Sequence, residues 1–127
     1  MPSIAYVHRF ITSMAFTMVV ETAMLFIVVR LVAKEKGIAT WRIIAAGFLA
    51  SYATIPYVWF VIPRVVEWER ETSLLVSEPL IFLIEIAIYR LVLGIQWRHA
   101  VLASLVGNLA SYLLGPFLRG QGLWIYW

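Results

Sequence analysis

The sequence contains no cysteine and few charged residues. The absence of cysteine excludes disulfide bonds, thiolate metal sites and cysteine nucleophiles. Charged residues make up 13% of the 127 residues and hydrophobic residues 63%, with a mean hydropathy of +0.90. Soluble domains are roughly 45–50% apolar, and a chain of this size cannot bury so large an apolar excess in its own interior. We therefore expect an integral membrane protein whose surrounding solvent is lipid.

Motifs of several enzyme classes are also missing. The sequence has no H-E-x-x-H, no G-x-S-x-G, no phosphate-binding loop and no paired metal-ligand motif. It therefore predicts no cofactor and no metal site, and an enzyme is the less favoured class. The net charge of +3 is modest, and the basic residues lie in short runs between apolar segments. Such runs are typical of orientation signals in membrane proteins and not of a nucleic-acid surface.

Four apolar runs organise the chain. They cover residues 10–33, 41–63, 73–95 and 99–118, and a transmembrane helix needs roughly 20 predominantly apolar residues. The links are short, so neighbouring helices should be antiparallel. Gly37 is expected to end the first helix, and the aromatic tail, residues 124–127, is expected to lie at the level of the lipid headgroups. The predicted fold class is an all-α integral membrane protein with four transmembrane helices in one membrane domain, residues 1–127.

Lys and Arg residues indicate which ends of these helices face the cytoplasm. Six lie near the first and third links, and four lie near the opposite ends of the helices. The first set is Arg30, Lys34, Lys36, Arg42, Arg90 and Arg98, and the second is Arg9, Arg64, Arg70 and Arg119. Because cytoplasmic ends carry an excess of positive charge, we expect both termini to lie outside.

A ten-residue pattern occurs twice in the chain. Residues 47–56 and 107–116 both read G-x-L-A-S-Y-x-x-x-P, and upstream of each copy a glutamate, Glu21 or Glu85, lies within a long apolar run. We interpret the chain as a tandem duplication of a two-helix hairpin, with repeat 1 at about residues 10–66 and repeat 2 at about residues 73–118. Since each repeat holds two spans, both copies insert the same way up, which predicts a parallel repeat about an axis along the membrane normal.

The small residues of the repeated pattern are candidate helix-packing positions. Gly47 and Ser51 are four residues apart, and Gly107, Ser111 and Gly115 extend the same spacing. Small residues at this spacing let a second helix approach closely. That second helix belongs either to the same chain or to another subunit. The proline that closes the first copy lies within an apolar run and predicts a kink there.

The two glutamates fall near the bilayer midplane. A charged carboxylate at that depth costs several kcal/mol, so we expect Glu21 and Glu85 to be neutral acids in hydrogen bonds. Polar residues at similar depth on the partner helices complete a candidate site for a substrate or ion: Ser51, Tyr52, Asn108, Ser111 and Tyr112. The alternative is a hydrogen-bond network that only holds the helices together. Glu78, near the outer end of the third run, is expected to cap that helix.

Three functional hypotheses remain open. The first is an oligomeric transporter or channel subunit, because four helices are too few to enclose a path alone. The second is a non-catalytic accessory or scaffold subunit that binds other membrane subunits. The third is a membrane enzyme acting on lipid-linked substrates, for which no nucleophile is evident. The chain resembles small four-helix bacterial membrane proteins with Glu in odd helices and an N-x-x-S motif in even ones, here Asn108 and Ser111. No activity is carried over from this resemblance. We expect the protein to be integral to a bacterial or archaeal cell membrane.

Overall fold

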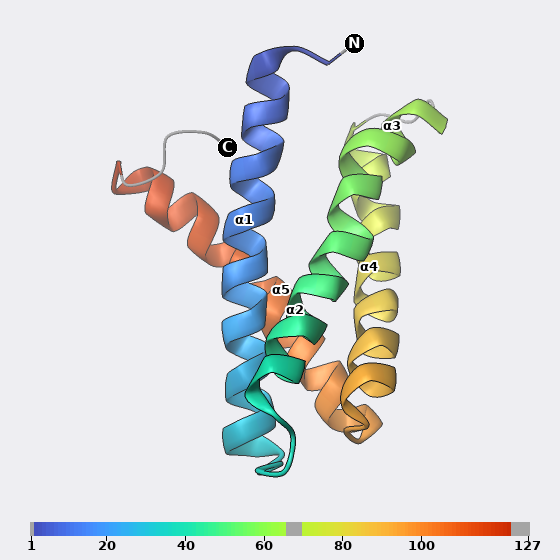
Figure 1. Ribbon diagram of the computed structural model, residues 1–127. Coiled ribbons are helices and arrows are strands. Elements are labelled where there is room, and N and C mark those ends of the chain that lie inside the picture. Colours follow the sequence, from blue (N-terminus) through green and yellow to red (C-terminus); the bar gives the residue numbers. More distant parts are fainter. Residues whose placement is uncertain (1, 66–69, 123–127) are drawn as a thin grey trace.

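The structure, a computed structural model, describes residues 2–65 and 70–122 and consists of helices joined by short links (Figure 1). Its elements are α1 (Ile4–Ile27), η1 (Val28–Val32), α2 (Thr40–Pro56), η2 (Tyr57–Val61), α3 (Ile62–Val65), α4 (Arg70–Leu93) and α5 (Trp97–Gly120). None of the described residues forms a strand, so the predicted all-α class is confirmed for this part of the chain. The charged second link, residues 66–69, and the aromatic tail, residues 123–127, lie outside the described residues.

Three helices of the described part of the chain are long and apolar enough to cross a membrane. They cover Ile4–Val32, Thr40–Val65 and Trp97–Gly120, because the π-helical segments η1 and η2 continue α1 and α2 without a break. The fourth long helix, α4, has the same length as α1 and α5, 24 residues. It carries Glu78, Glu85 and Arg90 in its sequence. The composition and length of the three helices support the expected membrane location.

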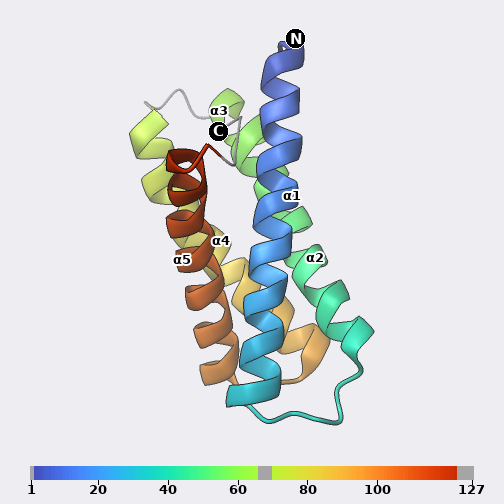
Figure 2. The ribbon, with the colours of Figure 1, turned by 90° about the vertical axis from the view of Figure 1, so that its left-hand side faces the viewer.

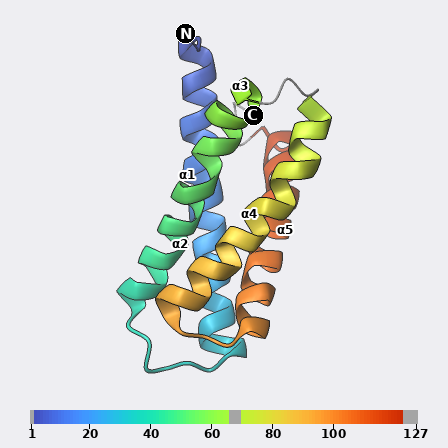
Figure 3. The same ribbon diagram turned by 90° about the vertical axis from the view of Figure 1, so that its right-hand side faces the viewer.

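The four long helices form a closed ring in which each helix packs on two others. α1 packs on α2 and α5, and α4 packs on the same two helices. Figure 2 shows α1 beside α5, and Figure 3 shows α4 in front of α2 and α5. The links at residues 33–39 and 94–96 lie at one end of the bundle, and the N-terminus lies at the other (Figure 1). The hairpins α1–α2 and α4–α5 therefore run in the same direction.

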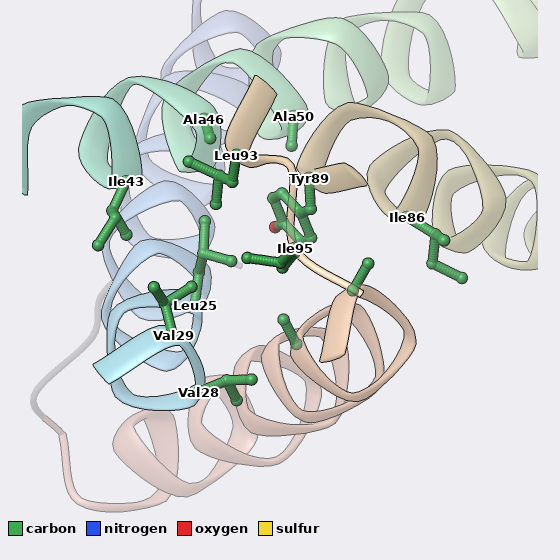
Figure 4. Packing of buried hydrophobic residues seen from close by; sticks show 12 residues of the cluster. Leu25, Val28, Val29, Ile43, Ala46, Ala50, Ile86, Tyr89, Leu93 and Ile95 are labelled. Carbon is green, nitrogen blue, oxygen red and sulfur yellow. The ribbon is translucent and has the colours of Figure 1, made fainter. Parts of the chain in front are cut away.

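The core lies at the end of the bundle that contains these two links, which we call the linked end. Figure 4 shows side chains from all four long helices converging there, with Tyr89 and Ile95 near the centre. The cluster consists of Leu25, Val28, Val29, Ile43, Ala46, Ala50, Ile86, Tyr89, Leu93, Ile95, Ala100 and Ala103. In lipid, close van der Waals packing of this kind is a main source of helix association. The core closes the bundle at this end.

The first helix ends differently from the sequence-based expectation. Lys34, and not Gly37, takes the left-handed conformation, with a φ of 57°. The N–H of Glu35 donates to the carbonyl of Val29 at 3.0 Å, one residue further back than in a Schellman helix end, and the last turn is π-helical. The guanidinium of Arg30 donates to the carbonyl of Glu35 and holds the turn. The prediction that Gly37 ends the helix is therefore wrong, because these hydrogen bonds stabilise a left-handed lysine.

The second helix changes its geometry after Pro56. Proline has no N–H to donate, and the N–H of the next residue, Tyr57, donates to the carbonyl of Thr54. The turn that follows, Tyr57–Val61, is π-helical. Such wide turns occur within α-helices where the regular hydrogen-bond ladder is interrupted, frequently at functional sites. The distortion expected at this proline thus takes the form of a change of helix type.

Candidate functional site

A cavity of about 420 Å³ lies between the core and the end of the bundle that holds the N-terminus. Side chains from all four long helices line it. The polar ones are Ser13, Thr17 and Glu21 from α1, Ser77, Glu78 and Glu85 from α4, and Asn108, Ser111 and Tyr112 from α5. Apolar side chains, including three from α2 and η2, complete the walls. The two glutamates predicted at the midplane therefore line one common cavity.

Glu21 is held by a single serine of the neighbouring helix. Its side chain is 3% exposed, and its Oε2 accepts a hydrogen bond from the Oγ of Ser51 at 2.8 Å. Ser51 is fully buried on α2, one turn after Gly47, whose carbonyl also lies 3.2 Å from the serine Oγ. The bond joins α1 to α2 within the first hairpin.

Glu85 accepts hydrogen bonds from more side chains than Glu21 does. It is 1% exposed, and its Oε2 accepts hydrogen bonds from the Oγ of Ser104 and the Nδ2 of Asn108, both at 2.6 Å. The asparagine also donates to the carbonyl of Ser104 at 2.9 Å, which fixes its orientation along α5. The Oε1 of Glu85 has no hydrogen-bond partner among the described residues. One carboxyl oxygen therefore accepts two bonds while the other is left unpaired.

The remaining predicted site residues divide between the cavity and the outer surface. Ser111 lines the cavity, and its Oγ donates to the carbonyl of Asn108 at 3.0 Å. Tyr112 also lines the cavity, although 69% of its surface is exposed, which places it at the rim. Tyr52 is 65% exposed and is not among the residues that line the cavity. The structure thus gathers the polar residues of α5 at the site and leaves Tyr52 outside it.

The glycines of the repeated pattern lie against α1. A Cβ atom added to Gly47 would lie 2.9 Å from the Cβ and 3.0 Å from the Cα of Thr22. At Gly107 the nearest atom would be the Cγ of Glu21, at 3.4 Å. Gly115 is buried further along α5. The first two glycines therefore sit where α2 and α5 approach the part of α1 that carries the first carboxyl.

Sequence reasoning missed several polar residues of the site. Ser104, Ser13 and Ser77 are buried and at most 3% exposed, and the last two line the cavity. One signal was present in the spacing, because Ser13 and Ser77 each lie eight residues before a glutamate of the repeat. Eight residues are a little over two helical turns, so each serine lies on the same face as its glutamate.

The cap predicted for Glu78 is wrong. α4 begins at Arg70, so Glu78 lies more than two turns inside the helix and lines the cavity instead. The helix continues through the proline that follows, Pro79. A third carboxyl is thereby added to the wall of the site.

Among the described residues, the charged groups that line the cavity are all acidic. Three carboxyl groups line it, and no basic residue is among the described residues of its wall. The buried carboxyls accept hydrogen bonds from neutral hydroxyl and amide groups, which stabilise a carboxylate less than a cation does. Across the described part of the chain, no three His, Cys, Asp or Glu side chains come together in a way that suits a metal ion. The arrangement is suited to holding a proton or a cation.

A scan against protein-family models finds no match to the chain, and comparisons with curated proteins and with solved structures find none either.

Proposed function

We propose that the protein is a subunit of an oligomeric transporter or channel that takes up protons or cations in this cavity. One observation carries the proposal. Glu21 and Glu85 are buried in the same cavity, at 3% and 1% exposure, with no basic residue among the described lining. Ionisable groups inside a membrane are costly, and they mark ion and proton pathways by default.

We further infer four spans and a duplicated hairpin, with α4 as the fourth span. The ring supports this inference, because α1 and α4 each pack on both α2 and α5. The serines eight residues before each glutamate support it too, since both are buried and line the cavity. An axis along the membrane normal relates two like-oriented hairpins in this arrangement.

The closed end of the bundle supports the oligomeric form of the proposal. The apolar core separates the cavity from the linked end, so a single chain offers a path only part of the way across. A complete path needs either movement of this core or a route shared between copies of the chain. The proposal takes the second form, a homo-oligomer embedded in the lipid bilayer of a bacterial or archaeal cell membrane.

The test is flux into vesicles. The purified protein is reconstituted in vesicles of phosphatidylcholine and phosphatidylglycerol, and a potassium diffusion potential, negative inside, drives cations inward. A trapped pH indicator reports protons, and a trapped sodium indicator reports a monovalent cation. We expect the wild type to raise at least one influx above protein-free vesicles. Glu21→Gln and Glu85→Gln should return it to that background, because an amide cannot exchange a proton or balance a cation.

Glu35→Gln is the matched control. Glu35 lies in the first link and outside the cavity lining, so removal of its charge should leave the flux unchanged. Monodisperse elution and helical circular dichroism show whether each variant folds. The proposal is wrong if wild-type vesicles carry neither flux, or if both cavity variants conduct like the wild type.

A specific observation also favours the accessory or scaffold function. Each of the side-chain hydrogen bonds to the two carboxyls joins two helices of one hairpin, Glu21 to Ser51 and Glu85 to Ser104 and Asn108. A network of this kind stabilises helix pairs without any transport. If it is the whole role of the glutamates, purification in a mild detergent should recover other membrane subunits in a fixed stoichiometry. A lone homo-oligomer would count against it.

A further inference from the structure

The cavity is acidic at the end next to the core, and its walls are apolar and aromatic. Glu21 and Glu85 lie at the end of the cavity next to the core. Glu78 lies farther from the core on α4. The walls include Trp59 from η2, Phe82 from α4 and the ring of Tyr112 from α5. An anion is repelled by three carboxyls without a basic neighbour, whereas the faces of aromatic rings attract cations. The lining therefore selects a positively charged ligand that also carries apolar surface.

Two buried polar groups of the lining lack partners. Ser13 is 3% exposed, and its Oγ has no hydrogen-bond partner among the described residues. The same is true of the Oε1 of Glu85. Buried polar groups are nearly always hydrogen-bonded, so each such exception needs an explanation. A carboxyl oxygen accepts, and a serine hydroxyl both accepts and donates. Ser13 lies eight residues before Glu21 on α1, about 12 Å along the helix, so one N–H group cannot reach both groups. A ligand with an N–H donor would satisfy the Oε1 of Glu85.

The size of the cavity fits a small organic molecule. Its volume of about 420 Å³ lies within the range of roughly 300–1,000 Å³ that is usual for ligand pockets. A bare metal ion would use neither this volume nor the aromatic walls, and hard cations prefer several oxygen ligands. One free carboxyl oxygen suits an N–H group of an ammonium ion better.

We propose that the cavity binds a primary or secondary organic ammonium ion with an apolar body, one of its N–H groups on the Oε1 of Glu85. The body lies against the aromatic walls. The inference that this ligand is transported rests on the proposed function, but the inference that it binds does not. Because the carboxyls are expected to be protonated when the site is empty of cations, binding of R–NH₃⁺ to the carboxylate releases the carboxyl proton to solvent.

Other titratable groups face the same carboxyls and enter the proton count. Glu21 faces the cavity from α1, Glu78 and Tyr89 lie on α4 with Glu85, and Tyr112 lies on α5. The described lining from α2 and η2 contributes no titratable group. The proton that is released comes from a carboxyl, because a tyrosine hydroxyl holds its proton far above neutral pH.

The experiment uses 2-phenylethylamine as the probe and isothermal titration calorimetry on the protein in phosphatidylcholine nanodiscs. We expect saturable binding of the amine and about tenfold weaker binding of 2-phenylethanol, which keeps the apolar body without the charge. Phenylpropionate, an anion, should not bind. Tetraethylammonium, a cation without N–H groups, should bind about tenfold more weakly than the amine. Titrations in two buffers of different ionisation enthalpy should report proton release.

A variant of the cavity tests the named contact. Glu85→Gln should weaken amine binding by at least about tenfold and abolish the proton release. Thr12→Ala is the matched control on α1, because Thr12 donates to the carbonyl of His8 in its own helix and is not among the residues that line the cavity. Its binding should equal that of the wild type.

The outcomes separate this inference from the proposed function. The inference is overturned if the alcohol binds as tightly as the amine, or if Glu85→Gln leaves amine affinity unchanged. Should Glu85→Gln fail to fold, the buffer-dependent proton release of the wild type and the weaker binding of 2-phenylethanol and tetraethylammonium decide instead. Amine binding without flux in vesicles supports the site and contradicts transport. Flux without amine binding supports transport and contradicts this ligand class.

Discussion

The two hairpins carry the same acid in different surroundings. Glu21 of the first hairpin accepts one hydrogen bond from Ser51, whereas Glu85 of the second accepts two on a single oxygen. The extra donors, Ser104 and Asn108, stand where the first copy has Ile44 and Phe48. The repeated pattern therefore places both acids alike, and the residues around the pattern decide how each acid is held.

The two partner helices also present different faces to the bundle. Ile44 and Phe48 of α2 are largely exposed, at 42% and 45%, while the matching Ser104 of α5 is buried. The motif serine is buried in both helices, but only Ser51 donates to a carboxyl, and Ser111 bonds within α5. A repeat in sequence thus does not fix the rotation of a helix about its axis, because that rotation follows from which flanking residues are polar.

The largest expected difference between the hairpins concerns the motif glycines. In Gly47→Ala the new Cβ would collide with the Cβ and the backbone Cα of Thr22, at 2.9 and 3.0 Å. Backbone must then shift, and overpacking of this kind costs about 1–3 kcal/mol. In Gly107→Ala the nearest neighbour, the Cγ of Glu21, is at 3.4 Å. That variant should be neutral or gain up to about 1 kcal/mol from the higher helix propensity of alanine.

Thermal unfolding of both variants in the same detergent measures this difference. The comparison fails if Gly47→Ala is as stable as the wild type, or if the two variants lose stability equally. Equal losses would mean that α1 approaches α2 and α5 at the same distance, contrary to the described packing.

The fold was more predictable from the sequence than the site. The apolar runs predicted the long helices, because hydrophobicity over about 20 residues is a strong signal. The left-handed residue at Lys34 and the π-helical turn after Pro56 depend on individual hydrogen bonds, which composition does not reveal. Glu21 and Glu85 stood out as acids in apolar runs. Single serines do not stand out, and their roles depend on helix rotation.

A smaller difference is expected between the serines that hold the two carboxyls. Ser51→Ala removes the hydroxyl that donates to Glu21, whereas after Ser104→Ala the Nδ2 of Asn108 still donates to Glu85. Hydrogen bonds between membrane helices contribute about 0.6 kcal/mol on average and up to about 1.7 kcal/mol. We expect Ser51→Ala to lose about 1 kcal/mol and Ser104→Ala to lose less. Unfolding in mixed detergent micelles measures both, and a larger loss in Ser104→Ala would contradict the assigned donors.

The smallest effect on stability is expected at the serines that precede each acid. Ser13→Ala removes a buried hydroxyl that has no partner among the described residues, so the folded state loses no bond and avoids the cost of burying an unpaired polar group. Ser77, its counterpart in the second hairpin, has an interaction partner, so Ser77→Ala should be destabilising. Unfolding of both variants without any added amine tests this contrast. A loss of stability in Ser13→Ala as large as that in Ser77→Ala would show that the hydroxyl of Ser13 is satisfied in the folded protein.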